Sequence, residues 1–96
     1  MTISLNDNVK IPDEVLSTVV GDEMVLLNLK TGTYFGFDTI GARFFQLLAE
    51  TDQLGTIHGR MMEEFDVPAD RLEQDLLRLS EQMVSKGLLA VEEQKV

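Results

Sequence analysis

The sequence contains no cysteine and no tryptophan, and its only histidine is His58. Without cysteine the chain can form neither a disulfide nor a thiolate-ligated metal site, a composition typical of proteins that stay in the reducing cytoplasm. A lone histidine cannot build a zinc site unless several carboxylates lie at fitting positions. We therefore expect a cytoplasmic protein without a metal or other cofactor, in which His58 has a surface or packing role.

Long hydrophobic runs are also missing. No stretch reaches the length of a membrane-spanning helix, and the first residues lack the cationic start and apolar run of a secretory signal. Hydrophobic residues still make up 44% of the 96 positions, which is enough for one small core. The composition predicts a single soluble globular domain with no membrane partner.

Basic residues are scarce, because eight Lys and Arg stand against 17 Asp and Glu, which leaves a formal net charge of -9. A strongly negative field repels the phosphate backbone of nucleic acids. It favours association with neutral or basic partners instead. The charge balance therefore argues against a nucleic-acid partner.

Catalytic signatures are absent as well. None of the four serines lies in a Gly-x-Ser-x-Gly context, and there is no glycine-rich phosphate-binding loop. Acidic pairs such as Glu63 and Glu64 are most simply explained as solvated surface charge. The sequence predicts a protein that is not an enzyme and that has no catalytic residue.

Three short strands joined by tight turns are predicted between residues 15 and 37. Val15–Val20 and Met24–Leu29 are apolar, β-prone runs, and Thr33–Phe37 is a third run rich in aromatic side chains. Gly32 suits the turn before the third run because glycine readily adopts a positive φ. Together the runs predict an antiparallel meander.

Three amphipathic helices are predicted to follow, over Thr39–Glu50, Leu54–Phe65 and Ala69–Lys86. Apolar residues recur in them at spacings of three and four, as expected for helices with one buried face. Gly87 follows the third helix, where a residue that tolerates the left-handed conformation ends many helices. The order predicts an α+β domain of winged helix-turn-helix-like architecture, with a three-stranded antiparallel sheet followed by three helices.

The two ends of the chain carry weaker patterns. Residues 1–14 show neither a helical nor a strand period and are predicted to form a flexible N-terminal arm. The folded domain is expected to cover residues 15–91, and residues 92–96 are expected to form a C-terminal tail.

The charge of the third helix bears on DNA binding, which winged-helix domains often perform. A recognition helix places Arg, Lys, Asn or Gln against bases and phosphates. Here the basic residues are outnumbered by acidic ones, with Arg71, Arg78 and Lys86 against Asp70, Glu73, Asp75 and Glu81. The helix is net acidic, so a winged-helix nucleic-acid-binding regulator is kept only as an alternative.

Peptide binding agrees with the sequence better than DNA binding does, and the reason lies in the third strand. As the last strand of the meander, it is expected to leave one backbone edge unpaired, and such an edge can accept an extended peptide as an additional strand. Alternation along Thr33–Phe37 puts Thr33, Phe35 and Phe37 on one face and Tyr34 and Gly36 on the other.

The third helix is a candidate for the opposite wall of such a groove, with Arg71, Asp75 and Arg78 available for polar contacts. The residue pattern alone is equally compatible with two simpler roles. In the first, the aromatic residues simply form part of the core and bind no ligand. In the second, the protein is a dimerisation module whose strand edge is buried against a second copy of the chain.

An ordered set of segments resembles the PqqD-like family. Leu27–Arg43 resembles its strand–turn–strand–helix segment, and Glu63–Val67, Leu72–Asp75 and Lys86–Leu89 continue the resemblance downstream. No single motif is diagnostic, but their combination in this order is specific. The resemblance covers residues 15–91, the whole predicted domain.

The resemblance implies a non-catalytic peptide chaperone, also called a recognition element for ribosomally synthesised and post-translationally modified peptides (RiPPs). Members of the family bind the leader segment of a precursor peptide against the third strand, beside the third helix, and deliver it to a modifying or processing enzyme. Thr31–Phe37 is more similar to the recognition proteins of lasso-peptide pathways, whose partner is a leader peptidase. It is less similar to those of pyrroloquinoline quinone (PQQ) synthesis, whose partner is a radical-SAM enzyme.

Carried over by position, the resemblance implies a peptide-binding site on the third strand and the third helix. Its residues are Thr33, Tyr34, Phe35, Gly36, Phe37, Arg71, Leu72, Asp75, Leu76, Arg78 and Leu79. Asp75 would either hold a cation of the leader or cap a local backbone group. The partners implied are a precursor leader peptide and its enzyme, with no nucleic acid and no membrane, for a protein that is a monomer or a weak dimer.

Overall fold

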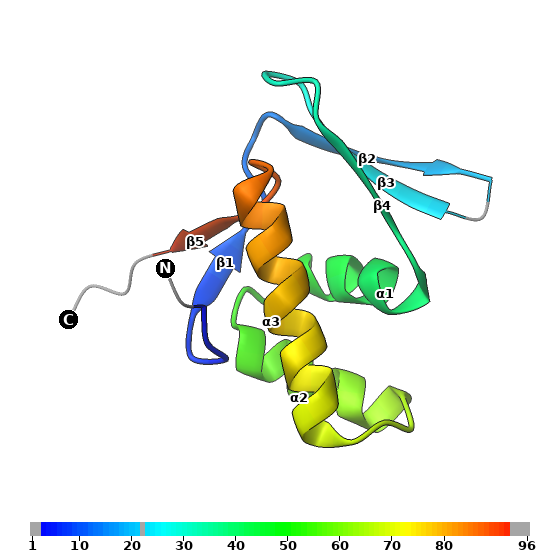
Figure 1. Cartoon of the computed structure of the whole chain (residues 1–96), viewed down its shortest axis with the longest axis vertical. Helices are drawn as coiled ribbons and strands as arrows, with labels where there is room; N and C mark the ends of the chain where they lie inside the picture. Colours follow the sequence, from blue (N-terminus) through cyan, green and yellow to red (C-terminus); the bar gives the residue numbers. More distant parts are fainter. Residues whose placement is uncertain (1–2, 22, 93–96) are drawn as a thin grey trace.

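The computed structural model describes residues 3–21 and 23–92. Its elements are β1 (Asn8–Lys10), β2 (Val15–Val20), β3 (Glu23–Asn28), β4 (Tyr34–Phe37), α1 (Thr39–Leu48), α2 (Leu54–Glu64), α3 (Ala69–Ser85) and β5 (Ala90–Glu92) (Figure 1). The three-stranded sheet followed by three helices confirms the predicted α+β class and is compatible with a winged-helix-like fold. No helix in the described part of the chain combines the length and apolarity that crossing a membrane requires.

The sheet has the order β2-β3-β4, and both pairs of strands are antiparallel. Leu26 of β3 pairs with Ser17 of β2 and Phe35 of β4, so these side chains share the face that packs on the helices. Leu26 on this face is fully buried, whereas Tyr34 on the other face is 71% exposed. The predicted alternation of side chains along β4 is therefore confirmed.

Local sequence explains where the helices begin and end. Asp38 caps α1, as its carboxylate accepts a hydrogen bond from the Gly41 N–H at 2.9 Å. α3 ends one residue earlier than predicted, and Gly87 beyond it has a φ of 73°. α2 and α3 are also joined by His58, whose Nε2 donates to the Ala69 carbonyl at 2.9 Å.

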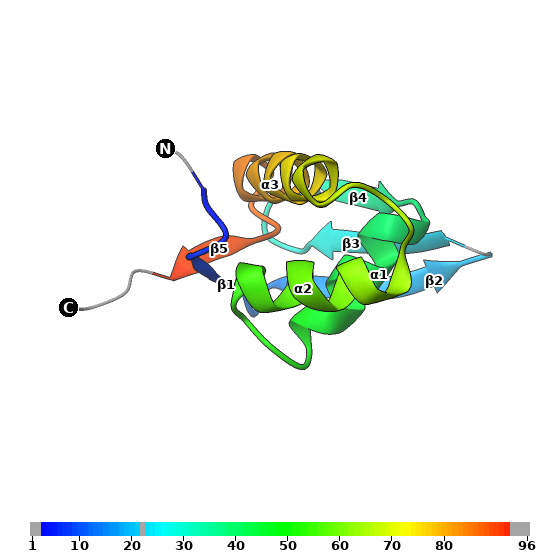
Figure 2. The ribbon, with the colours of Figure 1, turned by 90° about the horizontal axis from the view of Figure 1, so that it is seen from below.

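One core joins the sheet and all three helices. Its buried apolar side chains are Ile3, Val9, Val15, Leu26, Phe37, Phe44, Leu47, Leu54, Ile57, Met61, Leu72, Leu76, Met83, Leu88 and Leu89. In both views of the ribbon, α3 runs beside β4 at the edge of the sheet (Figures 1 and 2). The edge strand and the longest helix thus face each other along one side of the molecule.

The N-terminal residues differ from the prediction of a flexible arm without a strand. β1 pairs with β5 in antiparallel register, with Val9 opposite Val91, and forms a separate two-stranded sheet (Figure 1). Val9 is fully buried and Ile3 is 4% exposed, so both belong to the core. A three-residue strand is too short to show a period, and its partner lies at the other end of the chain. The predicted tail of residues 92–96 begins one residue too early, because Glu92 pairs with Asn8 as the last residue of β5, and residues 93–96 lie outside the described residues.

Candidate functional site

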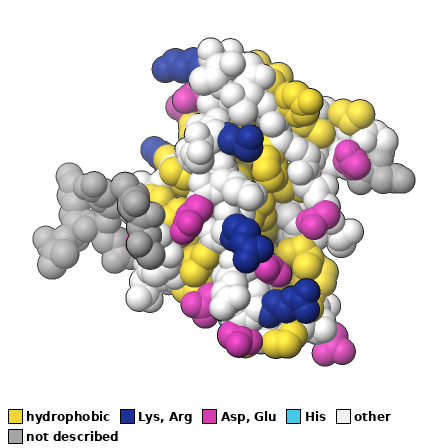
Figure 3. All heavy atoms as spheres, in the orientation of Figure 1, with side chains coloured by type: hydrophobic (Ala, Val, Ile, Leu, Met, Phe, Trp, Pro, Cys, Tyr) yellow, Lys and Arg dark blue, Asp and Glu magenta, His cyan; other side chains and the backbone are white. Residues whose placement is uncertain are grey.

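A cleft opens between the free edge of β4 and the exposed side of α3, and we call it the β4–α3 cleft. Two hollows of about 400 and 290 Å³ form it. The first is lined by Phe35, Arg78, Glu81, Gln82, Ser85 and Lys86, and the second by Phe35, Gly36, Phe37, Asp38, Leu79 and Gln82. Phe35 and Gln82 belong to both hollows, which makes the cleft continuous. On this face, apolar side chains fill a recess beside α3, and Lys and Arg side chains border it (Figure 3).

The backbone of β4 has one free edge. The Asn28 N–H donates to the Thr33 carbonyl at 2.8 Å, so Thr33 is a hydrogen-bonding position toward β3. Antiparallel pairing alternates such positions, which directs the N–H and C=O of Phe35 toward β3 and those of Tyr34 and Gly36 outward. No strand of the described chain pairs with that outer edge. Two residues of β4 therefore offer donors and acceptors to an extended segment.

Aromatic rings form the floor of the cleft. The rings of Phe35 and Phe37 meet edge to face, with centroids 5.3 Å apart and planes at 64°. Phe37 also stacks on Phe45 of α1, with centroids 6.1 Å apart. Phe37 is only 5% exposed, whereas Phe35 is half-buried. Phe37 is thus an anchor of the core, and Phe35 keeps ring surface that a ligand can contact.

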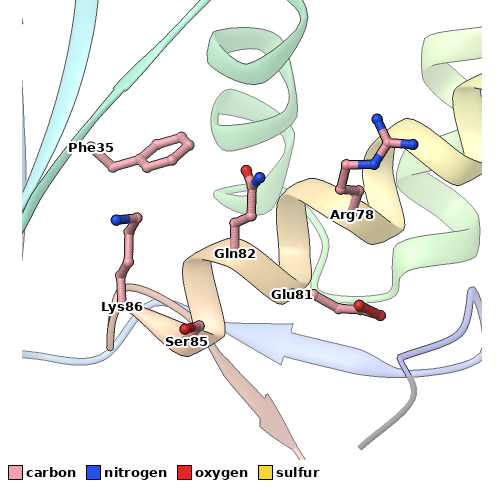
Figure 4. A pocket seen from close by; sticks show the side chains of 6 residues that line it. All are labelled: Phe35, Arg78, Glu81, Gln82, Ser85 and Lys86. Atoms are coloured by element: carbon pink, nitrogen blue, oxygen red, sulfur yellow. The ribbon is translucent and has the colours of Figure 1, made fainter.

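The opposite wall is made by the C-terminal half of α3. Gln82 and Lys86 extend toward the side on which Phe35 lies, whereas Glu81 points away from that ring (Figure 4). Gln82, Ser85 and Lys86 are exposed, and Leu79 is half-buried. The wall therefore combines polar groups near the mouth with an apolar surface deeper in the cleft.

The structure brings together five of the eleven site residues predicted from the sequence. Phe35, Gly36, Phe37, Arg78 and Leu79 line the cleft. The other two predicted strand residues do not line the cleft. Thr33 directs its backbone toward β3. Tyr34 offers only its backbone at the free edge, because its side chain lies on the opposite face of the sheet.

The remaining predicted residues lie in the first half of α3. Leu72 is 1% exposed and Leu76 is fully buried, so both belong to the core, and their burial does not fit a direct role in the wall. Arg71 and Asp75 lie on the same half of the helix and line neither hollow.

Sequence reasoning missed five cleft residues, namely Asp38, Glu81, Gln82, Ser85 and Lys86. Glu81, Gln82 and Ser85 on α3 and Lys86 just after it continue from Arg78 at spacings of three and four, which keeps them on one exposed side of the helix. That spacing is a usable signal, because it extends the predicted wall by two turns beyond Leu79.

The ion pairs of Arg43 and Arg60 lie outside the cleft. Arg43 binds Glu64 at 2.7 Å, and Arg60 binds Glu50 at 3.1 Å. The hydrogen bond from Arg43 lowers the pKa of Glu64, although both groups are largely solvated. Within the described residues, no group of three His, Asp or Glu side chains could hold a metal ion.

Comparisons with known proteins give a family match and two similar folds. The sequence matches the family described as "Coenzyme PQQ synthesis protein D (PqqD)" over residues 23–89. No curated protein matches the sequence.

Two solved structures have a similar fold. "TbiB1 in Complex with the TbiA(beta) Leader Peptide" is 38% identical, with a TM-score of 0.79 over 88% of this chain and 99% of that one. "Lasso peptide synthetase B1 complexed with the leader peptide" is 19% identical, with a TM-score of 0.78 over 86% of this chain and 98% of that one. At 19% identity the second likeness concerns the fold alone.

Proposed function

Because this chain belongs to the PqqD family, we propose that it is a non-catalytic RiPP recognition element, which binds the leader segment of a ribosomal precursor peptide. The leader adds a strand to β4 in the β4–α3 cleft. The chain performs no chemistry itself. It raises the local concentration of the precursor beside a separate enzyme that processes or modifies it.

The observation that carries the proposal is the free edge of β4, which faces α3 across an open cleft. An added strand would run about 4.8 Å from β4, and alternate side chains of the peptide would enter the cleft. Backbone hydrogen bonds to Tyr34 and Gly36 supply affinity, and side chains that contact Phe35 supply specificity. An extended peptide must offset its own ordering cost, so we expect a Kd on the order of micromolar or tighter.

The partner enzyme is proposed to be a leader peptidase of the lasso type, in preference to a radical-SAM enzyme of PQQ synthesis. The structure solved with a leader peptide, which is 38% identical and spans most of this chain, supports a leader as the bound peptide but names no enzyme. The similarity of Thr31–Phe37 to lasso-pathway recognition proteins agrees with this choice.

A titration followed by NMR tests the proposal. The isotope-labelled protein is titrated with the TbiA(beta) leader peptide and with the leader of the precursor encoded beside its own gene. We expect amide shifts at Tyr34 and Gly36 and along α3 from Arg78 to Lys86, with β2 unchanged. Shifts confined to β2 would refute strand addition to β4, and no shift at millimolar concentrations of either peptide would count against leader binding itself.

A dimerisation module is the second candidate, because β2 is also an edge strand. Its Leu16, Val19 and Val20 are exposed by 53%, 66% and 63%. Sedimentation velocity over a range of concentrations separates the two functions. A tight dimer that does not dissociate when leader peptide is added would favour this second candidate.

A further inference from the structure

We propose that the segment captured in the β4–α3 cleft carries an acidic side chain beside Phe35, where it pairs with Lys86. This inference rests on the proposed function and adds to it the chemical class of the peptide. It runs against the net charge of the protein, which at -9 disfavours acidic ligands.

The first argument is where the unpaired cations lie. Arg43 and Arg60 are held by the carboxylates of Glu64 and Glu50. The other five described Lys and Arg residues form no ion pair with any residue that the structure describes. Two of them, Arg78 and Lys86, line the cleft, whereas Lys10, Lys30 and Arg71 lie outside it. Although the chain has 17 acidic residues, the cations at the cleft are left without an acidic partner.

The second argument is the direction of the side chains. Lys86 extends toward the side of Phe35, whereas Glu81, the only carboxylate that lines the same hollow, points away from the ring (Figure 4). At the other end of the cleft, Asp38 is engaged as the cap of α1. The cleft is therefore positive at its Lys86 end and negative at its Asp38 end, and this polarity favours one orientation of a charged peptide.

The geometry of strand addition gives the spacing of the acidic residue. We take the peptide to pair antiparallel to β4, as both existing strand pairs of this sheet do. β4 runs from Phe35 toward Asp38, so such a peptide runs in the opposite sense and reaches Lys86 last. Side chains that enter the cleft alternate along the peptide and lie about 7 Å apart. The second hollow, lined by Phe35, Phe37 and Leu79, takes an apolar side chain. From its N-terminal to its C-terminal end, the recognised peptide pattern is thus an apolar residue, then any residue, then Asp or Glu.

A peptide display selection tests this inference. The TbiA(beta) leader peptide is randomised at each position and selected on the wild-type protein, on Lys86→Glu and on Lys10→Glu. Lys10 is an exposed residue of β1, outside the cleft, so its substitution makes the same change in net charge. We expect the wild type and Lys10→Glu to enrich Asp or Glu two positions after an apolar residue, and Lys86→Glu to enrich Lys or Arg there.

Affinity measurements complete the test. Replacing the selected carboxylate by its amide should weaken binding to the wild type by about 3- to 10-fold, the range of a partly desolvated ion pair. The same replacement should have no effect on Lys86→Gln, which adds no acidic charge to the end of α3. Selected peptides without an acidic preference, or a preference that persists in Lys86→Glu, would overturn this inference while leaving leader binding intact. Failure to select any peptide would overturn the proposed function and this inference together.

Discussion

The side-chain amide of Asn28 donates a 2.7 Å hydrogen bond to the carbonyl of Gly87, which is 59 residues away in the sequence. Its oxygen accepts hydrogen bonds from the N–H groups of Lys30 and Thr31, at 2.8 and 3.1 Å. Asn28 is only 3% exposed. One buried side chain therefore joins the turn before β4 to the end of α3 and holds the two walls of the cleft together at one end.

Replacing Asn28 by alanine should lower the free energy of unfolding by about 2–3 kcal/mol, because it leaves a carbonyl and two N–H groups without their partner. Urea denaturation measures the loss. Gln74→Ala, at an exposed position of α3, is the control and should change little. Equal stability of the two variants would mean that this link does not hold the cleft.

Gly36→Pro should abolish leader binding without unfolding the protein. The N–H of Gly36 points to the free edge, so proline removes a donor for the added strand and leaves the β3–β4 pairing in place. Gly36→Ala is the control, since a Cβ there would meet nothing closer than the Glu23 carboxylate at 4.0 Å. Isothermal titration calorimetry should give wild-type affinity for Gly36→Ala and no measurable heat for Gly36→Pro. Undiminished binding by the proline variant would rule out pairing at this residue.

Two glycine-to-alanine substitutions should have opposite effects on stability. A Cβ on Gly41 would lie 2.6 Å from Cδ1 of Phe37, so Gly41→Ala must displace the floor of the cleft, at a cost of about 1–3 kcal/mol. A Cβ on Gly59 meets nothing within 4 Å, and alanine there should stabilise α2 by up to about 1 kcal/mol. Thermal unfolding followed by circular dichroism compares them. A stabilised Gly41→Ala variant would contradict the close packing of α1 on Phe37.

Ser80→Ala should raise the free energy of unfolding by about 1 kcal/mol. Ser80 is fully buried in α3, and its hydroxyl has no hydrogen-bond partner among the described residues. Alanine removes the unsatisfied group and is also the better helix former. Urea denaturation should show a higher midpoint with an unchanged slope. A lower midpoint would show that the hydroxyl does have a partner in the folded protein.

Most of the fold could be predicted from short-range patterns in the sequence. The apolar spacing of the helices and the turn at Gly32 are both encoded within a few residues, and each appears where the sequence predicts it. Pairing of β1 with β5 could not be predicted in this way, because two three-residue strands carry no period and join opposite ends of the chain.

The site was predicted less completely than the fold, and the reason lies in α3. A helical period identifies a buried stripe but not the element on which it packs. Leu72 and Leu76 belong to the stripe that enters the core, whereas Gln82 and Lys86 lie beside β4. Only the angle between helix and sheet decides which turns of the helix reach the strand, and that angle depends on contacts between residues far apart in the sequence.

The pairing of β1 with β5 also determines how the molecule responds to a pulling force. Asn8 lies opposite Glu92, so the described chain leaves this ladder at the same end from both strands. Tension applied there would load the hydrogen bonds one at a time, as in unzipping, and not all together, as in shear. A ladder loaded in this way resists tension less than one of the same length loaded in shear.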